Sequence, residues 1–219
     1  MVVHAVIADL VGSRRVASRT AVQRALAPAF ARVEALVPSV DGLAATVGDE
    51  FQGLYSSLAD ALAATQLLRL VLLPVVDTRY GIGAGERTVV DDTVTPPIQD
   101  GTAWWSARAA VDALGSGAGR RRRTWYDGRH AAPGAPDAAL VNALLLTRDA
   151  LTDRLGDRGP AVLLRLLEGA TQQEIALAEG VSPSAVSQQV RRGVGAARDA
   201  HLLVRRAGSD ATDDGVATR

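Results

Sequence analysis

The sequence predicts an α+β fold, in which a ferredoxin-like βαββαβ domain is followed by an all-α domain that contains a helix-turn-helix. Two observations support this prediction. In the first part of the chain, short apolar runs alternate with longer segments that repeat apolar residues at helical spacing. From about residue 137 onward only helical patterns remain, and two of them begin with residues typical of helix N-termini.

Seven segments account for the order of the first domain. Strand character, meaning a short apolar run bounded by turn residues, is found at 2–8, 43–47, 51–55 and 79–85. Helical repetition of apolar residues is found at 18–37, 58–73 and 102–114. The second and third strand-like runs flank Gly48-Asp49-Glu50, which indicates a hairpin. In a ferredoxin-like sheet the first and third strands are central neighbours, so we expect their ends to lie close together.

The domain boundaries follow from changes in composition. We expect the α+β domain at residues 1–127 and a linker rich in glycine, alanine and proline at 128–136. The helical domain is expected at 137–207, with the helix-turn-helix at 171–192. Residues 208–219 are polar and lack periodicity, so a disordered tail is predicted there.

Composition excludes several classes of protein. The chain has 219 residues, a formal net charge of zero and no cysteine, which rules out thiolate metal sites, thiol nucleophiles and disulfide scaffolds. All 24 residues counted as Lys or Arg are arginine, so lysine-based phosphate binding and Schiff-base chemistry are impossible. No apolar run approaches the roughly 18–20 residues of a membrane span, and no signal-peptide pattern is present. We therefore expect a cytoplasmic protein without a membrane partner.

Two aspartates are predicted to lie at the ends of neighbouring strands. Asp9 follows the first strand and Asp49 lies at the tip of the hairpin, so their carboxylates should converge. Close carboxylates repel unless a cation holds them, and Mg²⁺ or Mn²⁺ suits carboxylates together with phosphate oxygens. The turn after Asp9 would offer backbone amides to those phosphates. It consists of Val11, Gly12, Ser13 and Arg14. Both aspartates also fit ordinary turn chemistry, so a purely structural role stays open.

Three blocks of sequence resemble class III nucleotide cyclase domains. They are Asp9-Leu10-Val11-Gly12, Val47-Gly48-Asp49-Glu50-Phe51 and Arg79-Tyr80-Gly81-Ile82-Gly83-Ala84-Gly85-Glu86. The second block is also similar to the signature of diguanylate cyclases. Over its full length, including residues 100–108, the chain resembles the SatD family of bacterial proteins. These resemblances imply that the first domain is nucleotide-cyclase-like.

The cyclase resemblance implies roles for three side chains. Asp9 and Asp49 match the two metal-ligand aspartates, and Arg108 matches the arginine that neutralises charge on the transferring phosphoryl group. The chain departs from the pattern at Trp104, where a cyclase has asparagine, and at Ala45, where it has a base-selecting lysine or glutamate. Contacts that read the base are then expected from Gln52, Gln99 or Asp100. This pattern favours binding over turnover.

Two further groups of residues have open interpretations. Trp104 and Trp105 are adjacent on a predicted helix, so at most one can lie deep in the core. The other is free for a dimer contact or for stacking on a nucleobase. Arg120–Arg123 fits a solvated loop, a contact to DNA phosphates or a clamp on the phosphates of a ligand.

Helical signals in the last third of the chain have the spacing of a helix-turn-helix. Thr171 and Glu174 form a capping-box pattern, Gly180 fits the tight turn, and Ser182-Pro183 fits the start of a second helix. Together they resemble bacterial helix-turn-helix domains of the sigma-region-4 kind. A helical packing or dimerisation module is the alternative.

The helix-turn-helix interpretation assigns DNA contacts to eight residues. The face expected in the major groove is Ser184, Ala185, Ser187, Gln188 and Arg191. Contacts to the DNA backbone are expected from Thr171, Gln172 and Arg192. One such module should bind weakly, so we expect a homodimer on double-stranded DNA.

The leading interpretation is a DNA-binding transcriptional regulator whose first domain senses a nucleotide or nucleotide-derived ligand with Mg²⁺. The alternative is an active nucleotide cyclase that acts on a nucleoside triphosphate with two metal ions. A third possibility is a structural DNA-binding protein whose first domain only dimerises.

Overall fold

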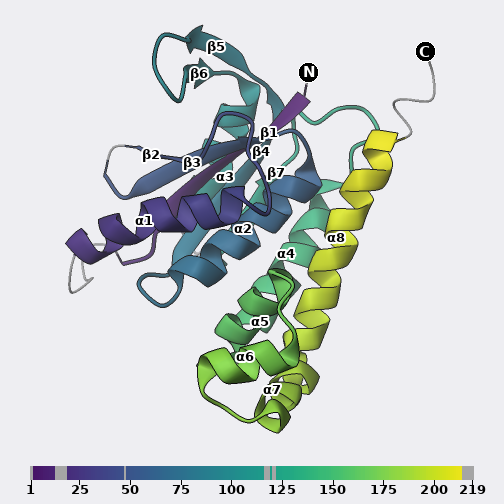
Figure 1. The fold of residues 1–219 in the computed structure, drawn as a ribbon. Helices are drawn as coiled ribbons and strands as arrows, with labels where there is room; N and C mark the ends of the chain where they lie inside the picture. The colour runs from purple at the N-terminus through teal and green to yellow at the C-terminus, as the bar shows by residue number, and fades with distance from the viewer. Residues whose placement is uncertain (1, 13–18, 47, 116–118, 120–121, 214–219) are drawn as a thin grey trace. The chain divides into compact units, whose positions relative to one another are not determined.

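The computed structural model describes residues 2–12, 19–46, 48–115, 119 and 122–213, and it describes the side chains as far as residue 208 (Figure 1). The chain has an α+β fold, with a mixed five-stranded sheet followed by a helical region. It divides into two compact units, Met1–Leu146 and Thr147–Arg219. The boundary lies inside a helix, whereas the sequence analysis expected it in a linker at 128–136.

The five-stranded sheet has the order β2-β3-β1-β4-β7. Its strands are β1 (Val2–Leu10), β2 (Ala44–Ala45), β3 (Glu50–Tyr55), β4 (Thr78–Glu86) and β7 (Thr124–Asp127). β1 is antiparallel to both of its neighbours, so that Val6 lies opposite Gly53 on β3 and Ile82 on β4. β7 runs parallel to β4. The predicted pairing of the first and third strands is confirmed.

Helices cover both faces of this sheet. In Figure 1, α1 (Arg19–Glu34) and α2 (Leu58–Leu72) lie in front of the strands, and α3 (Thr102–Gly115) lies behind them. On the α3 side, alternate residues of β1 pack with small residues of the helix in one buried cluster that includes Ala5 and Ala107. On the other side, the ring of Phe51 lies 5.2 Å from that of Phe30 and 6.1 Å from that of Tyr80. Burial on both faces explains why β1 is almost entirely apolar.

Glycines on β4 allow α3 to lie very close to the sheet. A Cβ atom on Gly83 would lie 2.1 Å from the backbone nitrogen of Ala107, and one on Gly81 would lie 2.3 Å from the carbonyl oxygen of the same residue. No other amino acid fits at this separation, because the atoms in the way belong to the helix backbone. The glycine-punctuated pattern of this strand therefore has a packing cause.

A two-stranded hairpin was not predicted from the sequence. It consists of β5 (Thr88–Asp91) and β6 (Ile98–Asp100), which pair with each other and not with the main sheet. Val90 and Ile98 are largely exposed, so the hairpin lacks the alternation of buried and exposed residues that reveals a strand. β2 is also shorter than the predicted run at 43–47, and residue 47 lies outside the described residues.

The second unit is helical. Its elements are the end of α4 (Ala138–Asp153), α5 (Gly159–Leu167), α6 (Gln172–Glu179), α7 (Pro183–Gln189), a π-helical turn at Val190–Val194, and α8 (Gly195–Asp213). Its core includes Leu163, Ile175, Val186 and Val194. α8 continues past the predicted end of the helical domain at 207, and residues 214–219 lie outside the described part of the chain. Within the described residues, no helix combines the length and the apolar character needed to cross a membrane.

Candidate functional site

The structure brings the two predicted aspartates to the same end of the sheet. Asp9 lies within β1, one residue from its end, and is directly opposite Glu50 on β3. The next residue along, Leu10, donates its backbone N–H to the carbonyl oxygen of Asp49 over 3.1 Å. The strand extends to Leu10, beyond the end predicted at residue 8, because Asp9 is paired in the sheet with both neighbouring strands and Leu10 is paired with Thr78 on β4.

An arginine neutralises Asp9. Arg79 lies opposite Asp9 on β4, and its guanidinium donates to the Asp9 carboxylate and, over 3.2 Å, to the carbonyl oxygen of Leu114 at the end of α3. Burial raises the pKa of Asp9 above its ordinary value. Arg79 opposes this rise, while the negative charges of Asp49 and Glu50 add to it. The three carboxylates are therefore close enough to repel one another.

Arg108 on α3 is held by a second carboxylate. Both of its terminal nitrogens donate to the two carboxylate oxygens of Glu50, each over 2.7 Å. This bidentate pair raises the pKa of Arg108, and Asp112 and Asp9 contribute to the rise. The residues matched to a cyclase thus lie together, but Arg108 is held by Glu50 and Asp9 by Arg79.

The arrangement is a poor match to a resident divalent cation. Among the residues that the structure describes, no three His, Cys, Asp or Glu side chains are grouped as metal ligands. A cation at Asp9 would have to displace Arg79. One backbone amide of the turn expected to bind phosphate is already used, because the Val11 N–H donates to the carbonyl oxygen of Asp77 over 2.8 Å. Gly12 has the positive φ of a turn glycine, at 69°, and Ser13 and Arg14 lie outside the described residues.

A cavity of about 490 Å³ lies beside this charged cluster. Its walls come from β1, β3, β6 and α3, and its lining residues are Ile7, Gln52, Gln99, Trp104, Trp105, Arg108, Ala109 and Asp112. Two of the three residues that the sequence analysis considered for base reading, Gln52 and Gln99, belong to this lining. The third, Asp100, accepts a hydrogen bond of 2.7 Å from the indole nitrogen of Trp105.

The two adjacent tryptophans have different environments. Trp104 is partly buried against the core cluster between β1 and α3. Trp105 is 59% exposed. The expectation that at most one of them lies deep in the core is confirmed, and the exposed indole stands at the rim of the cavity.

The predicted pair of helices in the second unit is formed by α6 and α7. Thr171 and Glu174 make both bonds of the capping box, with the Thr171 amide donating to the Glu174 carboxylate over 2.8 Å. Gly180 ends α6 in the left-handed conformation, with φ 63° and ψ 35°. Ser182 then caps α7 by accepting a bond of 3.2 Å from the Ala185 amide.

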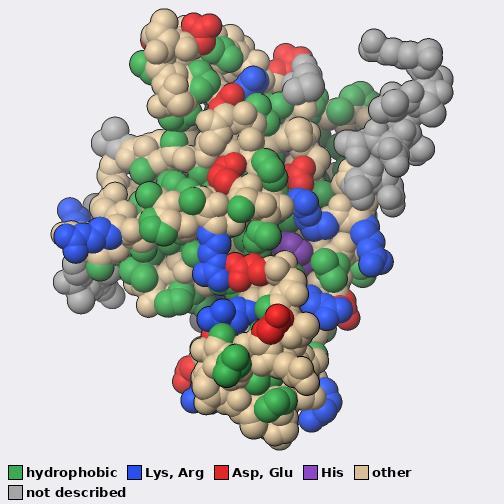
Figure 2. Space-filling view, viewed as in Figure 1, with side chains coloured by type: hydrophobic (Ala, Val, Ile, Leu, Met, Phe, Trp, Pro, Cys, Tyr) green, Lys and Arg blue, Asp and Glu red, His purple; other side chains and the backbone are tan. Residues whose placement is uncertain are grey.

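Residues proposed for DNA contact lie mainly on the surface of this pair. Those that are exposed are Thr171, Gln172, Ser184, Gln188, Arg191 and Arg192, and those that are partly buried are Ala185 and Ser187. The helix-turn-helix was predicted to end at residue 192, but α7 ends at Gln189, and Arg191 and Arg192 lie in the π-helical turn. Figure 2 shows arginine and acidic side chains on the visible face of these helices, so positive charge is not gathered in one patch in that view.

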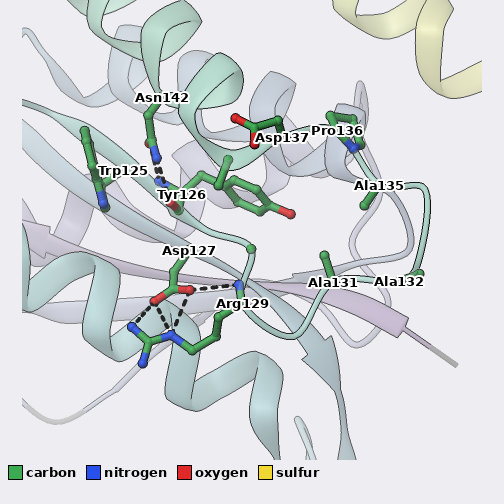
Figure 3. Close-up of a pocket in the computed structure, with 12 residues that line it drawn as sticks. Trp125, Tyr126, Asp127, Arg129, Ala131, Ala132, Ala135, Pro136, Asp137 and Asn142 are labelled. Carbon is green, nitrogen blue, oxygen red and sulfur yellow. Dashed lines mark hydrogen bonds and ion pairs between the residues drawn. The ribbon is translucent and has the colours of Figure 1, made fainter.

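A second cavity, of about 620 Å³, was missed by sequence reasoning (Figure 3). It lies between the end of β7 and the start of α4, and the segment interpreted as a linker forms its outer wall. Asn142 fixes the two elements by accepting from the Tyr126 amide over 2.8 Å and donating to the Tyr126 carbonyl over 2.9 Å. Arg129 pairs with Asp127 at its edge. The alanine- and proline-rich composition of this segment gave no signal of a binding role.

Comparison with known proteins identifies the family of the first unit. The family model described as "SatD family" matches residues 3–119, which is more than half of the chain. The chain belongs to the SatD family. The matched region of this SatD protein contains the charged cluster and the cavity beside α3.

Two solved structures are similar to parts of this SatD chain. The catalytic core of a rhodopsin-guanylyl cyclase with converted specificity, in complex with ATPαS, matches with a TM-score of 0.33 and 16% identity, over 49% of this chain and 70% of that chain. A regulator of polyketide synthase expression from Bifidobacterium adolescentis matches with a TM-score of 0.25 and 13% identity, over 94% of this chain and 86% of that chain. The search of curated proteins found no match.

Sequence reasoning also missed two members of the charged cluster. Arg79 and Glu50 both lie inside the blocks that resemble cyclases, but neither was singled out. The register of an antiparallel sheet was the signal that could have found them, because residues opposite Asp9 on both neighbouring strands must lie beside it.

Proposed function

We propose that this SatD protein is a DNA-binding transcriptional regulator. The observation that supports the proposal is the geometry of α6 and α7, two short helices that share a small core. Gly180 ends the first helix in a tight turn, and Ser182 caps the start of the second. The buried side of the pair includes Ile175 and Val186, whereas Ser184 and Gln188 face solvent. An exposed second helix held in this way suits insertion into the major groove.

Each exposed polar residue has a defined task in this proposal. Gln188 would pair with an adenine edge, and Arg191 with guanine or with a phosphate. Arg191 donates to the Ser187 hydroxyl over 3.0 Å, which orients its guanidinium along the helix. Thr171, Gln172 and Arg192 would contact phosphates and set the register of the protein on the duplex.

The test is selection from a pool of random-sequence DNA duplexes, followed by fluorescence anisotropy with the selected duplex. Gln188→Ala should cost about 1–3 kcal/mol on the selected sequence and little on a random one. Arg192→Ala should weaken binding to both and reduce the salt dependence. Arg154→Ala, which removes an exposed arginine outside the α6–α7 pair, is the matched control. Failure to enrich any sequence, with Arg154→Ala and Arg192→Ala indistinguishable, would contradict the proposal.

We further propose that the first unit senses a nucleotide-derived ligand and that two copies of the chain act together on paired half-sites. The cavity next to Arg108 supports the sensing role, and the need of a small module for a second half-site supports a dimer. Ligand binding would change the separation of the two second helices and so the affinity for DNA. DNA affinity that is unchanged by saturating ligand would argue against sensing.

An active nucleotide cyclase is the second candidate, favoured by the convergence of Asp9, Asp49 and Arg108. The ion pairs that hold Asp9 and Arg108 oppose it. A turnover assay tests it directly, with each nucleoside triphosphate plus Mg²⁺ or Mn²⁺ and chromatographic separation of the products. A cyclic or linked nucleotide that wild type makes and Asp49→Asn does not would establish the enzyme.

A further inference from the structure

One side of α4 is apolar and exposed. Leu140 is 71% exposed and Leu144, one turn later, is 37% exposed. The segment 138–147 contains no charged residue, whereas the exposed side of a surface helix normally carries charged or polar side chains. The core of the chain takes the other side of the helix, where Val141 and Leu145 are buried. The exposed leucines therefore form an apolar surface that this core does not cover.

The exposed positions of α4 have the spacing of a coiled-coil seam. Steps of three and four residues alternate along one side of the helix, and this repeat of about 3.5 residues keeps a stripe of side chains facing a neighbouring helix. The stripe, which we name the α4 seam, consists of Asp137, Leu140, Leu144, Thr147, Leu151 and Arg154. Leu151 is partly buried, and the other five are exposed. Leucines and one threonine thus occupy the middle of the seam, and opposite charges stand at its two ends.

A second copy of the chain fits the seam when the two helices lie antiparallel. A two-fold axis at the middle of the seam then brings each residue opposite a different residue of the same seam. Leu140 lies opposite the partner's Leu151, and Leu144 lies opposite the partner's Thr147. Both pairs bury leucine side chains that are exposed or partly exposed in the single chain, and this burial drives association.

The charges at the ends of the seam favour this orientation and this partner. Antiparallel helices bring Asp137 opposite the partner's Arg154 at both ends, whereas parallel helices would bring like charges together. Asp137 caps α4 through Oδ1, which accepts from the Ala139 and Leu140 amides over 2.8 Å and 3.2 Å, so its oxygen Oδ2 can accept from the arginine. Both end pairs are exposed and therefore set the orientation more than the affinity. Arg154→Ala is accordingly expected to leave the dimer largely intact.

We propose that α4 is the dimerisation surface of this SatD protein and that a second copy packs antiparallel on the α4 seam. The inference rests on the paired copies in the proposed function and names the surface that joins them. A nucleic acid is a poor occupant, because the seam offers one positive charge at one end and none along 138–147. Since a helix of 16 residues is about 24 Å long, the interface is small, and a Kd in the micromolar range is expected.

The first experiment is sedimentation equilibrium of the full chain, with a monomer mass of 22.8 kDa, over a series of concentrations. A monomer–dimer equilibrium is expected. Leu140→Glu should raise the dimer Kd by at least about tenfold, because the substitution occurs twice in the interface and places a charge opposite a leucine. Leu177→Glu is the matched control, since Leu177 is an 87% exposed leucine on α6, outside the seam, and should leave the Kd unchanged. Thermal unfolding checks that both variants remain folded.

The second experiment determines the register by cross-linking, which the absence of native cysteine makes specific. A mixture of Leu140→Cys and Leu151→Cys proteins should form a covalent dimer with a short bismaleimide, because these positions meet in the antiparallel pair. Leu140→Cys alone should not, since the two copies of residue 140 are then roughly 16 Å apart along the helices. A mixture of Leu140→Cys and Leu177→Cys is the control and should give no product.

Three results would overturn the inference: a monomer at every concentration, a dimer whose Kd Leu140→Glu leaves unchanged, or cross-linking of Leu140→Cys to itself. The second result keeps the paired copies of the proposed function but moves their interface elsewhere. Selection of DNA duplexes separates this inference from the regulatory proposal. A protein that dimerises through α4 but enriches no DNA keeps the interface and loses the regulatory role, whereas a monomer that enriches DNA keeps only that role.

Discussion

The close approach of α3 to β4 predicts a large effect of Gly83→Ala. The new Cβ would lie 2.1 Å from the backbone nitrogen of Ala107 and 2.4 Å from the carbonyl oxygen of Ala103, where ordinary contact begins at 3.4 Å. No flexible side chain can move aside, so α3 must retreat by roughly 1 Å and loosen the cluster around Ala5. Such overpacking typically costs about 1–3 kcal/mol, and backbone obstruction on two sides places this case at the upper end.

Urea unfolding followed by tryptophan fluorescence measures this effect, because Trp104 and Trp105 lie on the helix that moves. Gly115→Ala is the control, since a Cβ there meets nothing within 4 Å and the residue ends the same helix. We expect a much lower unfolding midpoint for Gly83→Ala than for Gly115→Ala. A difference below about 0.5 kcal/mol would refute the conclusion that glycine is required for this packing.

Three further predictions concern stability. Thr171→Ala removes the capping box of α6 and should cost about 1 kcal/mol in thermal unfolding. Complete loss of helicity, or no loss of stability, would contradict the role of the cap. The side chain of Arg69 is 5% exposed and donates to the carboxylate of Asp77, which Asp77→Ala removes. This substitution should cost about 3 kcal/mol, whereas Asp127→Ala, beside an exposed arginine, should cost less than about 1 kcal/mol. Burial lowers the pKa of His201 to about 4, and neighbouring arginines add to the effect. Because the unfolded chain takes up a proton near pH 6.5, stability of the helical unit should fall between about pH 6.5 and pH 4. A flat pH profile, or one that His201→Gln leaves unchanged, would exclude this coupling.

The regular elements could be predicted because their local patterns agree with their tertiary environment. The run at 2–8 is apolar because both faces of β1 are covered. The segment at 18–37 repeats apolar residues at helical spacing because α1 buries one side, whereas 58–73 is apolar almost throughout because α2 is buried on nearly every side. The β5–β6 hairpin could not be predicted, because its residues are largely exposed and its pairing is irregular between Val89 and Asp91. The extension of β1 to Leu10 depends on partners from other strands, which no local pattern contains.

The candidate site was only partly predictable for the same reason. Spacing along the chain indicated that Asp9 and Asp49 lie near each other, and the sheet order places them so. It did not indicate that Arg79 and Glu50 would neutralise Asp9 and Arg108, because those pairs arise from strand register and from the approach of α3.

The backbone break at Gly193 has a consequence for how DNA affinity could be controlled. Its φ of 132° and ψ of −20° lie outside the helical region, although helical turns flank it on both sides. α7 and α8 therefore do not form one continuous rod, and a rotation of α8 about its axis is not transmitted rigidly to α7. The side chains of Leu151 and Leu155 pack at this break, 3.1 Å and 3.5 Å from a Cβ built on Gly193. Substitutions at these two leucines, which are not among the residues proposed to contact DNA, are therefore expected to change the angle between α7 and α8.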